Sequence, residues 1–270
     1  MSAVDRVFDE LRAAGRKAFV PFITAGDPDL AITALLLAEL ARRGASVCEL
    51  GIPYSDPIAD GPVIQSSYTR ALANKIKLAG ILDMARQTAS KLQSPVVTMA
   101  SYAILYRHGL ERYVNDACEA GIAGAIVPDL PVEESGGLVE LCRRADFSLI
   151  QLVTPQTSRE RAIRIANTST GFIYYVSVTG ITGEREALPQ PVIEQVSWLR
   201  EQTKTPICVG FGISRPEQVR ALSAVADGVI VGSALVRRVA EGAGKPREQL
   251  VREVGDYAAS LVAALATSKS

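Results

Sequence analysis

Two acidic residues, Glu49 and Asp60, are the side chains in this sequence best suited to do chemistry. Glu49 lies in the short apolar run 46–51, which is typical of a buried strand. A buried acid is costly unless it has a partner or a chemical role, and no Lys or Arg is evident at the neighbouring strand ends. Burial would raise the pKa of Glu49 and suit it to general acid–base catalysis near neutral pH. The alternative is a structural Glu that pairs with a base or caps a turn.

Asp60 follows in a segment rich in proline, which is rigid enough to return a side chain over the end of the strands. A second interpretation is nearly as good, because Asp60 precedes Gly61-Pro62 and could be the N-cap of a helix. Asp56, in the same segment, is interpreted as a turn residue or an interface contact.

Two glycine-containing segments could hold a phosphate group. They are 210–214 (GFGIS) and 232–234 (GSA), and each follows a strand-like run. In α/β barrels the loops after strands 7 and 8 commonly bind phosphate through backbone N–H groups and a helix N-terminus. The glycine-flanked loop 179–186 is a candidate lid that also lends Gly183 to the phosphate. Ordinary turn glycines and a plain surface loop are the alternatives.

Other chemistries find little support in the residue types. No lysine stands at the end of a strand-like run, where it could form a Schiff base, and the single histidine, His108, argues against a histidine-rich zinc site. Asp129 is a possible third acid, although capping the next helix is the favoured role. Neither a dinucleotide fingerprint nor a Walker loop is present. The pattern therefore predicts proton transfer on a phosphate-anchored substrate, with no covalent or metal cofactor.

The elements that would position these residues repeat as strand, turn and helix, which predicts a single (β/α)₈ TIM barrel over residues 1–270 with an extra N-terminal helix. A doubly wound open sheet is the alternative. The expected strands are 18–24, 46–51, 95–99, 124–129, 147–153, 172–177, 206–210 and 228–232. The expected helices are 4–14, 32–43, 78–92, 111–120, 134–144, 159–167, 192–202, 216–223 and 247–265.

The charge balance narrows the class of partner. Lys plus Arg and Asp plus Glu both number 29, so no net field favours nucleic acid or an anionic membrane. No run is apolar for long enough to span a bilayer, and the N-terminus does not read as a signal peptide. The four cysteines are far apart and are expected to be reduced. These features predict a cytoplasmic protein that binds small molecules or other proteins.

Four motifs, in order along essentially the whole chain, resemble the tryptophan synthase alpha chain family. They are 21–28 (PFITAGDP), 49–62 (ELGIPYSDPIADGP), 128–131 (PDLP) and 210–214 (GFGIS). The resemblance implies cleavage of indole-3-glycerol phosphate to indole and D-glyceraldehyde 3-phosphate in tryptophan biosynthesis. It also implies a beta chain partner in an alpha2beta2 heterotetramer, with PLP in that beta chain and no cofactor in this chain.

The resemblance also assigns roles to single residues. Glu49 would protonate indole C3 and take the proton of the glycerol hydroxyl, while Asp60 would stabilise positive charge at the indole N–H. Thr182 would contact Asp60 when the lid closes. The expected substrate contacts are Phe22, Tyr174, Thr182, Gly183, Phe211, Gly212, Gly232 and Ser233.

Some positions depart from the pattern of the family. Ala103 and Ile104 stand where many members have Asn and Pro, which bears on contact with a beta chain, and Val178 replaces an Arg of enteric members, which bears on lid closure. Two other functions remain open, namely a stand-alone indole-3-glycerol-phosphate lyase and a catalytically weak subunit that mainly activates a beta chain. Another phosphate-binding barrel of the same pathway is a further alternative.

Overall fold

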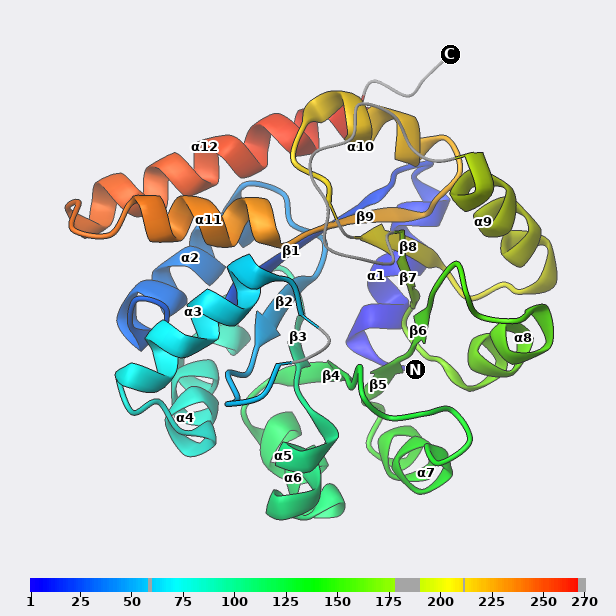
Figure 1. Cartoon of the computed structure of the whole chain (residues 1–270), viewed down its shortest axis with the longest axis horizontal. Helices are drawn as coiled ribbons and strands as arrows, with labels where there is room; N and C mark the ends of the chain where they lie inside the picture. Colours follow the sequence, from blue (N-terminus) through cyan, green and yellow to red (C-terminus); the bar gives the residue numbers. More distant parts are fainter. Residues whose placement is uncertain (58–59, 178–189, 211, 267–270) are drawn as a thin grey trace.

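The strands form one parallel sheet that curls into a ring (Figure 1). The computed structural model describes residues 1–57, 60–177, 190–210 and 212–266. Within them, the strands follow the order β5-β4-β3-β2-β1-β9-β8-β7-β6. They are β1 (Ala18–Thr24), β2 (Cys48–Gly51), β3 (Val96–Met99), β4 (Ile122–Ile126), β5 (Ser148–Ile150), β6 (Leu152–Val153), β7 (Ile173–Val176), β8 (Ile207–Gly210) and β9 (Gly228–Val231).

A single residue, Gln151, separates β5 from β6 and brings the two ends of the sheet together. β5 pairs with β4, and β6 pairs with β7, so one run of chain completes the ring. The backbone N–H of Gln151 donates to the Ser169 hydroxyl (3.1 Å), and the backbone carbonyl of Gln151 accepts from the Tyr174 N–H (3.0 Å). The predicted eight-stranded barrel is thereby confirmed, with the expected strand 147–153 split at Gln151.

Helices cover the outside of the ring, and most of them match the expected ranges. These are α1 (Ala3–Ala13), α2 (Leu30–Arg42), α4 (Leu78–Thr88) with the short 3₁₀ helix η1 (Ala89–Lys91), α6 (Leu110–Glu119), α7 (Gly136–Arg144), α8 (Arg159–Thr168), α9 (Gln190–Gln202), α10 (Pro216–Ser223) and α12 (Arg247–Ala266). Among the described residues, no helix combines the length and the apolar character needed to cross a lipid bilayer.

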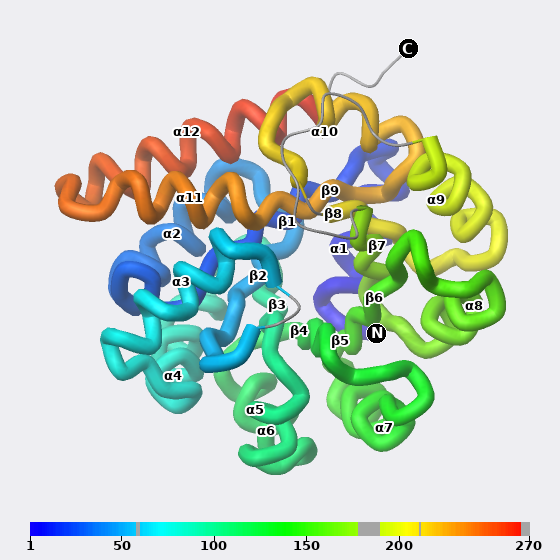
Figure 2. Tube along the Cα trace, viewed as in Figure 1, coloured from blue at the N-terminus to red at the C-terminus, as the bar shows by residue number. Residues whose placement is uncertain are grey.

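Three helices lie outside the expected helix ranges: α3 (Pro62–Ala73), α5 (Tyr102–His108) and α11 (Ser233–Glu241). On α3 the buried positions are Ile64, Ser67, Tyr68 and Ala71, so the inward face has helical spacing but is partly polar, which weakens the apolar period. α5 is only seven residues long. α3 and α11 lie side by side (Figure 2).

Strand side chains alternate between two apolar layers. Cys48 and Leu50 belong to the outer cluster beneath the helices, whereas Phe22 and Val47 belong to an inner cluster that fills the ring. Val4 and Phe8 of α1 also pack into the inner cluster, and α1 therefore closes the end of the barrel at which the strands begin. The other end, where the strands finish, is the end at which barrel enzymes build their active sites.

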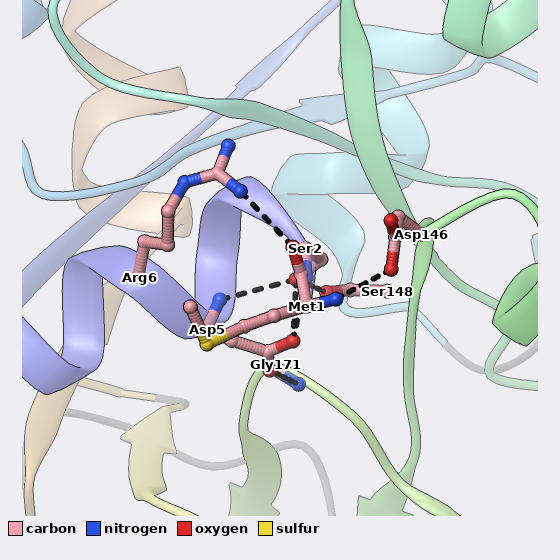
Figure 3. A network of polar contacts seen from close by, with 7 residues as sticks. All are labelled: Met1, Ser2, Asp5, Arg6, Asp146, Ser148 and Gly171. Carbon is pink, nitrogen blue, oxygen red and sulfur yellow. Dashed lines mark hydrogen bonds and ion pairs between the residues drawn. The ribbon is translucent and has the colours of Figure 1, made fainter.

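Asp5 anchors α1 to the barrel (Figure 3). Ser2 is the N-cap, and its backbone N–H donates to Asp5 Oδ2 (2.8 Å). Asp5 Oδ1 accepts from the Gly171 N–H (2.8 Å), and the Ser2 hydroxyl lies 2.7 Å from that of Ser148. The Asp5 carboxylate thus both caps α1 and fixes this helix to the barrel.

We predict that Asp5→Ala lowers the free energy of unfolding by about 1–3 kcal/mol, because it removes the capping partner of Ser2 and leaves the Gly171 N–H without its acceptor. Urea denaturation measures this change. Asp9→Ala, on an exposed position of the same helix, is the matched control and should change stability by less than about 0.5 kcal/mol. Equal effects of the two substitutions would contradict the anchoring role.

Candidate active site

A cavity of about 210 Å³ opens where the strands end. Its walls are residues on or just after β1, β2, β3, β7, β8 and β9, together with residues near the starts of α3 and α11. The lining residues are Phe22, Glu49, Asp60, Gly61, Ile64, Met99, Tyr174, Gly212, Ile213, Ser214, Gly232, Ser233, Ala234 and Arg237. The structure therefore brings seven of the ten sequence-predicted site residues to one cavity.

Glu49 projects into the ring from β2. Its Cα pairs with those of Phe22 on β1 and Val97 on β3, both in the inner cluster. Its side chain is fully buried, and neither carboxyl oxygen has a hydrogen-bond partner among the described residues. Burial, with a further contribution from the charge of Asp60, raises the pKa of Glu49 to about 8. The group is consequently protonated at neutral pH and can act as an acid.

Asp60 lies at the mouth of the cavity and does not cap α3. The N-cap of α3 is Gly61, which has no side-chain capping bond, so the helix-cap interpretation of Asp60 is wrong. The Asp60 carboxylate instead accepts from the Tyr54 hydroxyl at 3.4 Å. Burial raises the pKa of Asp60 to about 6; the bond from Tyr54 lowers this pKa, and the charge of Asp129 raises it.

The two acids therefore differ in protonation state near pH 7, where Glu49 is mostly neutral and Asp60 mostly ionised. Such a pair can divide the work of a reaction, because one member donates a proton while the other stabilises positive charge. The difference arises from environment: Glu49 is sealed in the ring, whereas Asp60 is only partly buried and has a phenol as donor.

The middle of the cavity is apolar and has room for a flat ring. Phe22 and Tyr174 face it, and a glycine beside each ring leaves the space that the ring needs. A methyl group on Gly51 would lie 2.7 Å from Cε2 of Phe22, and one on Gly210 would lie 2.7 Å from the Tyr174 hydroxyl. Glycines at the ends of β2 and β8 are thus required by packing.

The opposite wall suits an anion. α11 begins at Ser233, and its N-cap, Gly232, carries no side chain to satisfy the first backbone N–H groups. These groups border the cavity and favour a phosphate through the helix dipole. Gly212 has a φ of 77°, a backbone conformation that other residues rarely adopt. The hydroxyl of Ser214 is buried there without a hydrogen-bond partner among the described residues.

Arg237 also lines the cavity, although it was not predicted from the sequence. It lies one turn after Ser233 on α11, and the two share a face of that helix. Its position follows from the spacing only once α11 is known to exist. No lysine is among the described residues that line the cavity.

Three predicted site residues, Thr182, Gly183 and Phe211, lie outside the described residues, as do Val178 and the expected lid 179–186. Their proposed contacts stay predictions.

Asp129 has a structural role, although not the expected one. Its carboxylate accepts from the backbone N–H of Tyr102 (2.7 Å) and the hydroxyl of Ser101 (2.6 Å), so it holds the start of α5, whose N-cap is Ser101. The next helix, α7, has Ser135 as its N-cap. β3 and β4 are neighbours in the sheet, which places the end of β4 beside the start of α5. Ala103, one of the departures from the family pattern, lies in the first turn of α5.

His108 also has a structural partner, because its Nε2 lies 2.6 Å from Asp116 Oδ2 at the junction of α5 and α6. It is the last residue of α5 and lies two residues before α6 begins. Within the described residues, no group of three or more His, Cys, Asp or Glu side chains is arranged to hold a metal ion.

Residues 8–265 match the family model of the tryptophan synthase alpha chain. The alpha chain of Rhodopirellula baltica is 52% identical, over 97% of this chain and 98% of that relative. Among solved structures, the alpha subunit of Legionella pneumophila superposes with a TM-score of 0.89 at 37% identity, covering 98% of this chain and 99% of the other. Tryptophan synthase of Mycobacterium tuberculosis gives 0.89 at 30% identity, covering 98% of each chain.

The chain belongs to the tryptophan synthase alpha chain family. Members of this family are lyases of tryptophan biosynthesis that cleave the carbon–carbon bond of indole-3-glycerol phosphate, and the activity expected from the sequence is confirmed at that level. An alpha chain of tryptophan synthase implies a beta chain as its partner. No observation favours the stand-alone or activator alternatives.

The burial of Glu49 predicts a pH-dependent effect on stability. The folded-state pKa, about 8, lies above the ordinary value of 4.5, so the stability that protonated Glu49 contributes is complete below pH 4.5 and is lost as the pH rises through 8. Glu49→Gln stays neutral at every pH. We expect this variant to gain stability relative to the wild type, on the order of a few kcal/mol, between about pH 5 and about pH 9.

Thermal unfolding at both pH values measures the difference. Glu39→Gln is the control of opposite sign, because the bond from Arg42 holds the pKa of Glu39 below its ordinary value. The contribution of ionised Glu39 is complete above that ordinary value, so Glu39→Gln should be less stable than the wild type by the same amount at both pH values. A Glu49→Gln variant with a pH-independent difference would show that Glu49 is ionised in the folded chain.

Proposed function

We propose that Glu49 is the acid–base catalyst of indole-3-glycerol phosphate cleavage and that Asp60 stabilises the positive charge that forms on the indole ring. The observation that carries this assignment is the contrast in surroundings within one cavity: Glu49 is buried with no hydrogen-bond partner among the described residues, whereas Asp60 is only partly buried and accepts from Tyr54. Each role requires the protonation state that its residue has near neutral pH.

The proposed proton transfers balance on one carboxyl group. Protonated Glu49 gives its proton to indole C3, which places positive charge on the ring nitrogen, and the Asp60 carboxylate accepts a hydrogen bond from the indole N–H. The Glu49 carboxylate then takes the proton of the glycerol hydroxyl while the carbon–carbon bond breaks. The electron pair of the broken carbon–carbon bond returns to the indole ring, and the hydroxyl-bearing carbon becomes the aldehyde. Glu49 ends protonated, as it began. Proton transfer of this kind contributes roughly 10²–10⁴ to a rate.

We propose that the phosphate binds at the opposite wall, against the backbone of Gly212, Gly232 and Ser233, with Phe22 and Tyr174 beside the indole ring. The uncapped N-terminus of α11 and the open cavity above it support this orientation. It places the indole end of the substrate towards the two acids. Contacts of the substrate with Thr182, Gly183 and Phe211 are part of the same proposal.

We further propose an alpha2beta2 heterotetramer with the beta chain, in which PLP belongs to the beta chain and this chain carries no cofactor. A cytoplasmic location and a single domain over residues 1–270 are also proposed. The alpha-chain family supports the partner, and the described residues support a barrel with one apolar interior.

The decisive experiment is an indole-release assay with indole-3-glycerol phosphate, run with and without a beta chain. We expect kcat/KM of the wild type to follow a bell-shaped pH profile, with an acid limb near 6 from ionisation of Asp60 and an alkaline limb near 8 from loss of the Glu49 proton. Glu49→Gln should lower turnover by about 10²-fold or more while binding survives. Asp60→Asn should lose the acid limb and remain folded.

Glu133→Gln, on the exposed surface beside Arg161, is the matched control and should keep the wild-type profile. Wild-type turnover in Glu49→Gln would refute the catalytic assignment. Indole release that needs no beta chain for full rate would favour the stand-alone lyase.

The phosphate orientation is tested with Gly232→Ala. A methyl group there lies 3.5 Å from Cβ of Phe22, an ordinary contact, so the variant should fold, yet the methyl occupies the wall on which the phosphate rests. We expect the affinity for glycerol 3-phosphate to fall by about tenfold, equivalent to about 1.4 kcal/mol, with indole binding unchanged. Calorimetric titration measures both, and Gly136→Ala, in open space on α7, is the control. Unchanged phosphate affinity would contradict the orientation.

A further inference from the structure

The hydroxyl of Tyr68 is buried without a hydrogen-bond partner in the described part of the chain. Tyr68 is 1% exposed and shares the inward face of α3 with Ile64, which lines the cavity. A buried hydroxyl without a partner loses its hydration and gains nothing in return. Phenylalanine would pack the same ring without that loss, so packing alone does not explain the hydroxyl.

The Tyr68 hydroxyl lies beside the cavity wall close to the two acids. A methyl group on Gly51 would be 3.0 Å from this hydroxyl and 2.7 Å from Cε2 of Phe22, so the phenol and the edge of the Phe22 ring meet over the end of β2. Gly51 is two residues beyond Glu49 on the same strand. The hydroxyl is therefore adjacent to the place where the substrate ring would bind.

Asp60 is the candidate acceptor for this hydroxyl. The ring of Tyr68 packs at 5.5 Å against that of Tyr54, whose own hydroxyl donates to Asp60. After burial, the charge of Asp60 makes the largest contribution to the raised pKa of Tyr68, ahead of those of Tyr54 and Glu49. Glu49 is protonated near neutral pH and is the poorer acceptor, whereas ionised Asp60 has acceptor sites to spare and one long bond of 3.4 Å.

We propose that Tyr68 is a positioning residue for Asp60, and that in the substrate complex its hydroxyl donates a second hydrogen bond to the Asp60 carboxylate beside the bond from Tyr54. This inference rests on the role proposed for Asp60. Two phenols on one carboxylate hold it ionised and fix the direction in which its remaining lone pairs point. The carboxylate then meets the indole N–H without first having to reorient.

Tyr54 and Asp129 also set the pKa of Asp60, and both remain when only the Tyr68 hydroxyl is removed. The titratable and charged residues around it are Glu49 on β2, Tyr54 after β2, Asp129 after β4, Tyr174 on β7 and Arg237 on α11. A shift seen in Tyr68→Phe is thus attributable to the lost donor.

The test is the pH dependence of kcat for indole release by Tyr68→Phe in the full chain, because kcat reports the ionisations of the substrate complex, in which the bond forms. A donor to the charged form lowers the pKa of a carboxyl group, so its removal should move the acid limb upward by about one unit and lower the rate below that limb by about tenfold. The rate should recover as the pH rises. Tyr113→Phe is the matched control, because its hydroxyl lies 2.7 Å from Thr98 in the outer cluster; this variant should lose stability and keep the acid limb.

A second variant keeps the test independent of how well Tyr68→Phe folds. Difluorotyrosine placed at position 68 is a stronger donor of nearly the same shape and should move the acid limb downward. An acid limb unchanged in both variants would overturn the positioning role while Asp60→Asn still abolishes that limb. If Asp60→Asn retains the limb, the role of Asp60 itself fails and the inference about Tyr68 fails with it.

Discussion

The burial of one carboxyl group, that of Glu49, is the constraint on which the site depends. The group sits inside the ring with no hydrogen-bond partner among the described residues, and a charge there would be left without solvation. The neutral acid is therefore the favoured form in the folded barrel, and the pKa of Glu49 is raised to about 8. The same burial that weakens the fold at alkaline pH supplies a proton donor at neutral pH.

The parallel barrel makes this arrangement possible because its two ends serve different purposes. Where the strands begin, α1 seals the ring with Val4 and Phe8 and is tied down through Asp5. Where the strands end, glycines take the place of side chains, and the rings of Phe22 and Tyr174 occupy the space that is left. One end is therefore closed by a packed helix. The other keeps an open cavity, beside which buried polar groups lack hydrogen-bond partners among the described residues.

A difference in surroundings separates the chemistry of two similar acids. Glu49 is enclosed by apolar side chains, whereas Asp60 stands at the mouth with the Tyr54 hydroxyl as donor and the Asp129 charge nearby. Asp129 is itself held by the start of α5, so the capping of a helix after β3 influences the ionisation of Asp60. Loops after β2, β3 and β4 therefore act on one carboxylate, and a change in any of them would be felt there.

The sequence by itself determined the barrel and the place of Glu49. Period-two alternation and short apolar runs reflect local backbone geometry, so β1 was predicted to the residue and Glu49 was assigned to a buried face. The glycines after β8 and β9 were predicted as a phosphate site because bound phosphate needs exposed backbone, and both Gly212 and Gly232 line the cavity. Only the tertiary structure decided that Asp60 does not cap α3, that Asp129 holds the start of α5, that Arg237 lines the cavity and that Tyr68 lies beside Phe22. These four facts depend on which segments meet across the barrel. Contacts between strands and helices that are distant in the chain do not appear in the local periodicity of the sequence.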